Sequence, residues 1–205
     1  MKNKKTKILA IGDFHGDLRM VERIAEKVKK EQVDVVILSG DHTFAENSIQ
    51  GIIGPFAKQK KPVLIIPGNH ESVETNALMA EIYAPYSKNL HGYSFAKNGV
   101  GFFGAGTAHI GIHAIQDEEI FNLLKKSHNK IKDLKKKIMV THIHPEKTKF
   151  EFSGFAGSNA VRKAIEEFQP DFAICSHIHE ATGLEEKIGK TRIINVSRKE
   201  KIFEI

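Results

Sequence analysis

The stretch that decides the fold of this chain is Leu64-Ile65-Ile66-Pro67-Gly68-Asn69-His70-Glu71. An apolar run ends abruptly at Gly68, and three polar residues follow it at once. A short apolar run with such an end predicts a buried β-strand. The strand would deliver Asn69, His70 and Glu71 to its carboxyl end, which is where ligands bind in open α/β sheets.

Four further apolar runs end in the same way, and they are Ile8–Ile11, Val33–Leu38, Ile138–Val140 and Phe172–Cys175. The polar residues that follow them are, in chain order, Asp13 and His15, Asp41 and His42, His142 and His144, and His177 and His179. Five predicted strands therefore end on Asp, Asn or His, whose oxygen and nitrogen atoms are metal ligands.

The spacing of these polar residues predicts that their loops lie side by side. Asp13 and Asp41 are 28 positions apart, and so are Asp41 and Asn69. Each interval fits one crossover between parallel strands. His142 and His177 are 35 positions apart, which again leaves room for a loop, a helix and a strand.

Helices are predicted between these strands. We expect Asp17 to cap a helix that begins at Leu18, and Ser158 to cap a helix over Asn159–Phe168. Three further helices are expected at Glu46–Gln59, where the pattern is weak, at Glu71–Ile82 and at Asp117–Leu134.

Hairpins are predicted in the middle of the chain and near its end. Asn98-Gly99 is a strong turn signal between the runs Leu90–Ala96 and Val100–Ala105. Gly189-Lys190 joins Thr182–Ile188 to Thr191–Val196. Parallel strand–helix units together with antiparallel hairpins predict an α/β fold in which two mixed β-sheets lie face to face, flanked by helices.

The bulk properties are those of one globular domain, and we expect residues 1–205 to form it. The chain is 40% hydrophobic and 27% charged, and its apolar runs are too short to span a bilayer. The basic start, with Lys2 and Lys4, is not followed by a signal-peptide core. The single cysteine, Cys175, excludes an internal disulfide and predicts a cytoplasmic location.

The net charge of +6 gives two alternatives for the surface. A basic surface attracts phosphates or nucleic acid. The lysines are scattered along predicted helices and form no aromatic-interleaved RNA-binding motif, which favours an ordinary solvated face. Nucleic acid therefore stays a possible partner that the sequence does not favour, and the oligomeric state is open.

Seven side chains form the predicted metal-binding set: Asp13, His15, Asp41, Asn69, His142, His177 and His179. The mixture of oxygen and nitrogen atoms suits Mn²⁺, which we expect, with Fe, Ni²⁺, Zn²⁺ and Co²⁺ as alternatives. Seven ligands are too many for one tetrahedral ion. They are about right for two divalent ions that share one bridging carboxylate, roughly 3.5–4 Å apart as in two-metal hydrolases.

The order of these blocks resembles that of the calcineurin-like metallophosphoesterase superfamily. The blocks are Asp13-x-His15, Gly40-Asp41, Gly68-Asn69-His70-Glu71, His142 and His177-x-His179, and the resemblance covers nearly the whole chain. It is closest to the small single-domain, phosphodiesterase-like members. The resemblance implies a four-layer αββα sandwich and a dinuclear metal centre.

The resemblance also implies a role for each site residue. It assigns Asp13, His15 and His179 to one ion and Asn69, His142 and His177 to the other, with Asp41 bridging. It implies hydrolysis of a phosphodiester or a phosphomonoester, by attack of a hydroxide that bridges the metals. His70 would be the catalytic residue that assists the leaving group.

Two departures from the family pattern qualify these expectations. Ser176 stands where the last block usually has glycine, and we expect the site to survive this change. Gly40-Asp41-His42-Thr43 lacks the continuation found in serine/threonine protein phosphatases, which argues against a phosphoprotein substrate. The alternatives are a non-catalytic scaffold on the same fold and a nuclease.

Overall fold

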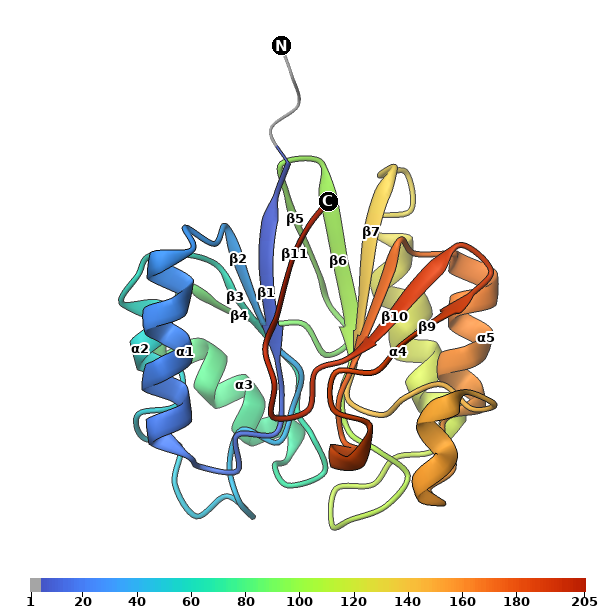
Figure 1. The fold of residues 1–205 in the computed structure, drawn as a ribbon, viewed down its shortest axis with the longest axis horizontal. Helices are drawn as coiled ribbons and strands as arrows, with labels where there is room; N and C mark the ends of the chain where they lie inside the picture. Colours follow the sequence, from blue (N-terminus) through green and yellow to red (C-terminus); the bar gives the residue numbers. More distant parts are fainter. Residues whose placement is uncertain (1–4) are drawn as a thin grey trace.

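A computed structural model describes residues 5–205, and Lys2 and Lys4 lie outside the described residues. Two β-sheets pack face to face and helices cover both outer faces (Figure 1). This is the predicted four-layer αββα sandwich, and the fold class is confirmed. In the part of the chain that the structure describes, none of the helices has the length and apolar character needed to cross a membrane.

The first sheet has five strands in the order β11-β1-β2-β3-β4. Its strands are β1 (Lys7–Ile11), β2 (Val35–Leu38), β3 (Val63–Ile65), β4 (Ser87–Asn89) and β11 (Lys201–Glu204). β1 to β4 are parallel, and β11 joins β1 in the antiparallel direction. The helices α1 (Leu18–Lys30), α2 (Gly54–Ala57) and α3 (Val73–Ile82) belong to this half of the molecule.

The second sheet has six strands in the order β5-β6-β7-β8-β10-β9. Its strands are β5 (Ser94–Lys97), β6 (Val100–Ala105), β7 (Lys136–Thr141), β8 (Phe172–Cys175), β9 (Glu185–Ile188) and β10 (Thr191–Asn195). The helices α4 (Asp117–Asn129) and α5 (Asn159–Phe168) cover its outer face (Figure 1).

The core has three layers because the strands are buried on both faces. In β1, Ile8 and Ala10 point into the layer between the sheets, whereas Leu9 and Ile11 pack with the outer helices. In the second sheet, Phe102 belongs to the layer between the sheets. Full burial of a side chain of this kind contributes about 1.5–3 kcal/mol, so the layers hold the strand ends in a fixed arrangement.

Local sequence signals account for several elements, and the predictions based on them are confirmed. Asp17 caps α1 by accepting a hydrogen bond from the Met20 amide at 3.0 Å, and Ser158 caps α5 through the Val161 amide at 3.1 Å. Asn98 and Gly99 adopt positive φ angles of 52° and 76°, as a two-residue hairpin turn requires, and they join β5 to β6.

Other boundaries differ from the predictions. In the predicted helix Glu46–Gln59 only Gly54–Ala57 is helical, because Glu46 has a positive φ and Gly51 and Gly54-Pro55 break the pattern. The predicted strand Leu90–Ala96 begins only at Ser94, and α4 ends at Asn129 rather than at Leu134. The short polar strand β4 was not predicted. Two 3₁₀ turns, η1 (Lys149–Ser153) and η2 (His179–Ala181), lie inside predicted irregular segments.

Candidate metal centre

All seven predicted ligands lie at one end of the sandwich, in the loops that follow β1, β2, β3, β7 and β8. These five strands run in the same direction within their sheets, so their carboxyl ends open on the lower edge in Figure 1. The structure thus brings the predicted set together at one edge and leaves none of its members elsewhere.

The first group of ligands consists of Asp13, His15 and His179. A carboxylate oxygen of Asp13 and one ring nitrogen from each histidine lie within 4.8 Å of one another. The Oδ1 atom of Asp13 is 3.4 Å from Nε2 of His179, and the two histidine Nε2 atoms are 3.3 Å apart. These atoms therefore surround a common point.

The second group consists of Asp41, His142 and His177, whose ligand atoms also lie within 4.8 Å of one another. Nε2 of His142 is 3.4 Å from Oδ2 of Asp41. The same Nε2 lies 3.1 Å from Oδ1 of Asn69, which places the amide at this group. His142 comes from β7 of the second sheet, so the site joins the two sheets.

Asp41 lies between the two groups. Its Oδ2 atom is 3.7 Å from Nε2 of His15 as well as close to His142. A third group of ligand atoms, within 4.8 Å of one another, is formed by His15, Asp41 and His70. His70 also donates its backbone amide to Oδ1 of Asp41 at 3.0 Å. The Asp41 carboxylate is thus the centre of the arrangement.

The backbone at the site is held in an uncommon conformation. Asp13, His15, Asp41 and His177 have φ angles of 59°, 47°, 50° and 70°, in the left-handed region that L-residues rarely adopt. Such conformations cost about 1–3 kcal/mol each and cluster at functional sites. Gly68 is required by a close approach, because a Cβ atom there would overlap the Asp41 carboxylate.

The donor set fits a pair of divalent cations. Two nitrogens that bind one ion at about 2.1 Å lie about 3.4 Å apart, close to the separation of the His15 and His179 Nε2 atoms. Oδ1 of Asp13 is buried and has no hydrogen-bond partner among the described residues. A buried carboxylate oxygen without a donor is costly unless a cation occupies the position.

The electrostatics of the cation-free site are dominated by Asp41 and His142. Burial alone would raise the pKa of Asp41, but the charge and hydrogen bond of His142 hold it well below its usual range. Burial alone would lower the pKa of His142, and Asp41 raises it to about 9. Burial lowers the pKa of His177 to about 3, so its imidazole is a neutral donor at physiological pH. A cation would replace the proton on His142.

Two supporting residues differ from the sequence-based expectation. Glu71 was predicted in the first turn of a helix, but it precedes α3, is fully buried, and its Oε1 accepts hydrogen bonds from the amides of His42 and Gly68. Burial raises its pKa to about 8. Ser176 donates its hydroxyl to the Ser39 carbonyl at 2.6 Å and lies 3.0 Å from Nδ1 of His142.

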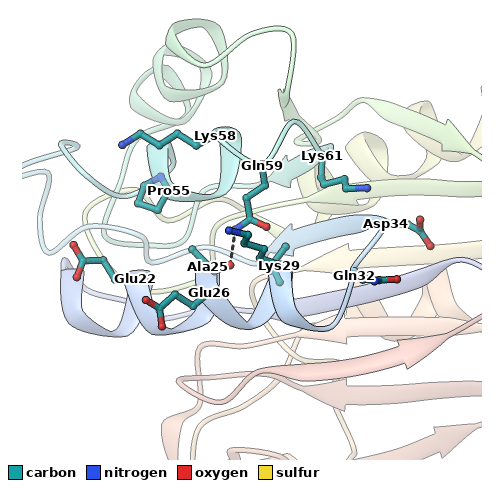
Figure 2. A pocket seen from close by; sticks show the side chains of 11 residues that line it. Glu22, Ala25, Glu26, Lys29, Gln32, Asp34, Pro55, Lys58, Gln59 and Lys61 are labelled. Carbon is teal, nitrogen blue, oxygen red and sulfur yellow. Dashed lines mark hydrogen bonds between the residues drawn. The ribbon is translucent and has the colours of Figure 1, made fainter.

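A separate groove of about 790 Å³ lies between α1 and α2 (Figure 2). It is lined by residues such as Glu22, Glu26, Lys29 and Lys58, and it contains none of the predicted ligands. Gln59 crosses it and donates its amide to the Ala25 carbonyl. The groove lies outside the candidate metal centre.

Comparison with known proteins places this geometry in a family. A model of the calcineurin-like phosphoesterase family matches residues 6–181, which is most of the chain. None of the curated proteins compared with the chain matches it.

Several solved structures share the fold. A protein of Thermus thermophilus is 18% identical, with a TM-score of 0.76 over 98% of this chain and 99% of its own. An archaeal phosphodiesterase is 14% identical, with a TM-score of 0.58 over 98% and 100% of the two chains. A dimetal phosphatase from Danio rerio is 13% identical, with a TM-score of 0.62 over 93% and 86%.

Proposed function

Because this chain belongs to the calcineurin-like phosphoesterase family, we propose that it is a metal-dependent hydrolase that cleaves phosphodiesters in preference to phosphomonoesters. The observation that carries the proposal is the convergence of two sets of ligand atoms on the Asp41 carboxylate. Structures of the same fold include an archaeal phosphodiesterase and a dimetal phosphatase, which supports both the reaction class and the two ions.

The chain would hold two divalent ions, Mn²⁺ first and Fe, Ni²⁺, Zn²⁺ or Co²⁺ as alternatives. Asp13, His15 and His179 hold one ion, and Asn69, His142 and His177 hold the other. Asp41 bridges them. When bound, such a pair activates water for attack on phosphorus and neutralises phosphoryl oxygens.

The protein's own groups complete the chemistry. Asn69 binds without adding negative charge, so the site stays attractive to an anionic ester. The His70 ring lies 4.7 Å from that of His15, with its backbone fixed by Asp41. It is therefore placed to donate a proton to the leaving oxygen, a contribution of about 10²–10⁴-fold for groups of this kind.

A scaffold without activity is the main competing proposal, and the complete ligand set argues against it. Evolution toward a binding role would not require Asp13 and Asp41 to keep strained backbones and buried carboxylates. We propose that residues 1–205 act as one domain, and that the protein works in the cytoplasm, which is compatible with a single, buried thiol at Cys175.

The test is the Asp41→Asn variant. Metal content is measured by elemental analysis after loading with Mn²⁺, and activity is measured on bis-p-nitrophenyl phosphate and p-nitrophenyl phosphate. We expect the variant to lose activity and at least one ion per chain, whereas Asp133→Asn, far from the site on the loop before β7, keeps both. Retained turnover with two bound ions would sink the assignment.

A further inference from the structure

Apolar side chains are concentrated around the candidate metal centre. Nine large hydrophobic residues are exposed in the described part of the chain. Six of them lie on segments at the edge that carries the ligands, and they are Leu18, Phe44, Ile110, Ile112, Phe152 and Phe155. Exposed apolar surface that gathers in one place marks a binding site rather than chance.

A first hollow of about 250 Å³ opens beside His15 and contains Leu18 and Phe44. The Phe44 ring is 56% exposed, yet it is not isolated. Its centroid lies 5.2 Å from that of His70, with an angle of 35° between the rings, and 6.2 Å from that of His15. Phe44 is thus an aromatic wall next to the proposed proton donor.

The segment that carries Phe44 is fixed in place. The Glu46 carboxylate accepts hydrogen bonds from the amide and the hydroxyl of Ser72, both at 2.7 Å, and Thr43 accepts the Glu46 amide at 3.2 Å. Polar groups of Asn47 and Gln50 also line this hollow. A flat ring with polar atoms at its edge fits this combination of an aromatic face and hydrogen-bonding groups.

A second hollow of about 190 Å³ opens on the other side of the ligand set, beside His177 and His179. Ile110 and Phe155 form its apolar walls, and Glu180 is at its rim. The Phe155 segment is also fixed, because the Gly157 amide donates to Glu151 at 2.8 Å. The carboxylate of Glu180 disfavours a second phosphate or another anion here.

Resting on the proposed function, we infer that the substrate is a phosphodiester with a flat aromatic leaving group against Phe44 and a neutral apolar or aromatic retained group against Phe155. A monoester has only one substituent and would leave the second hollow empty. The side of each group follows from His70, because the group that departs must lie beside the proton donor. Phe44 and Phe155 are then residues that determine specificity.

The experiment uses three esters with the same leaving group. p-Nitrophenyl phosphate and methyl p-nitrophenyl phosphate carry one ring, whereas bis-p-nitrophenyl phosphate also carries a ring on the retained side. We expect Phe44→Ala to raise KM for all three by about five- to tenfold, as the loss of one aromatic contact predicts. Phe155→Ala should raise KM only for the bis ester.

Two variants serve as controls. Phe44→Tyr keeps the ring and should retain the KM of the wild type. Leu78→Ala removes an exposed apolar side chain of α3, outside both hollows, and should leave all three KM values unchanged. Because Phe44, Phe155 and Leu78 are all exposed, none of these changes is expected to disturb folding, and circular dichroism checks this.

The outcomes separate the two proposals. Turnover by the wild type together with unchanged KM values in both alanine variants would overturn the inference and leave the proposed function intact. The reverse pattern, with Phe155→Ala affecting every ester and Phe44→Ala only the bis ester, would overturn the assigned sides. Absence of turnover with Mn²⁺, Ni²⁺ and Zn²⁺ would overturn the proposed function and this inference with it.

Discussion

The Oε1 atom of Glu71 accepts the backbone amide of His42 at 3.0 Å and so connects two loops that are far apart in the sequence. The same atom accepts the Gly68 amide at 3.2 Å. His42 follows Asp41, and Gly68 precedes Asn69. One buried side chain therefore fixes the loops that carry the proposed bridging ligand and the proposed amide ligand.

Replacing Glu71 tests this connection. In Glu71→Ala two buried amides lose their acceptor, so we expect a loss of about 2–5 kcal/mol in the free energy of unfolding and weaker metal binding. Glu71→Gln keeps an acceptor oxygen and should stay close to the wild type in both. Urea denaturation and metal titration measure the two effects. Equal losses in both variants would show that the charge of Glu71, and not its hydrogen bonds, is what the site needs.

A second prediction concerns the hydroxyl of Ser176, which lies 3.0 Å from Nδ1 of His142. That nitrogen is also 2.8 Å from the Ser39 carbonyl, so the serine helps to fix the imidazole. Supporting groups of metal ligands typically change metal affinity by 10–100-fold. We expect Ser176→Ala to weaken metal binding by about tenfold.

Ser87 supplies the matched control. It is a buried serine whose hydroxyl has no hydrogen-bond partner among the described residues, and it lies on β4. Ser87→Ala should leave metal affinity unchanged. If both substitutions reduce affinity equally in a calorimetric titration, the contact between Ser176 and His142 has no part in metal binding.

Short-range signals explain which parts of the fold could be predicted. The Asp17 and Ser158 caps and the Asn98-Gly99 turn depend on neighbours within four residues, and each is found in the structure. The ligand loops were predictable because an apolar strand followed by Asp or His fixes both position and direction. Chain distance mattered little, since parallel strands place their ends at one edge.

The features that were missed depend on contacts between distant residues. β4 has only three residues, Ser87–Asn89, and its pairing with β3 is not visible in its polar sequence. Glu71 has the composition of a helix start, but the partners of its carboxylate lie 29 and three positions away. The position of Phe44 against His70 likewise requires the folded loop. A search for a buried acid beside a ligand could have found only the role of Glu71.

The role of His70 leads to a third prediction. A proton donor matters most when the leaving group is a poor one, because a stable anion departs without a proton. His70→Asn should therefore lower kcat by about 10²–10⁴-fold for a phenyl ester and much less for a p-nitrophenyl ester. The variant should keep both ions in elemental analysis. Loss of an ion would instead make His70 a ligand, as its distance to His15 and Asp41 also permits.

A fourth prediction concerns Glu46, whose carboxylate fixes the segment that carries Phe44 to the start of α3. Hydrogen bonds from Thr75 and from the amide and hydroxyl of Ser72 lower the pKa of Glu46 to about 2, from a usual value of 4.5. A lowered pKa in the folded state means that the carboxylate stabilises the fold above about pH 4.5. The contribution is lost as the pH falls toward 2.

Glu46→Gln should consequently lower the free energy of unfolding at pH 7 by a few tenths of a kcal/mol to about 1 kcal/mol, since the exposed position screens the interaction. The difference from the wild type should shrink as the pH falls from 4.5 toward 2, because both proteins then carry an uncharged group. Glu74→Gln removes a charge from the first turn of the same helix without contacting Ser72, and it controls for the helix dipole. Urea denaturation across this pH range gives the answer. A difference between Glu46→Gln and the wild type that stays constant down to about pH 2 would mean that the carboxylate's ionisation is not what holds the Phe44 segment.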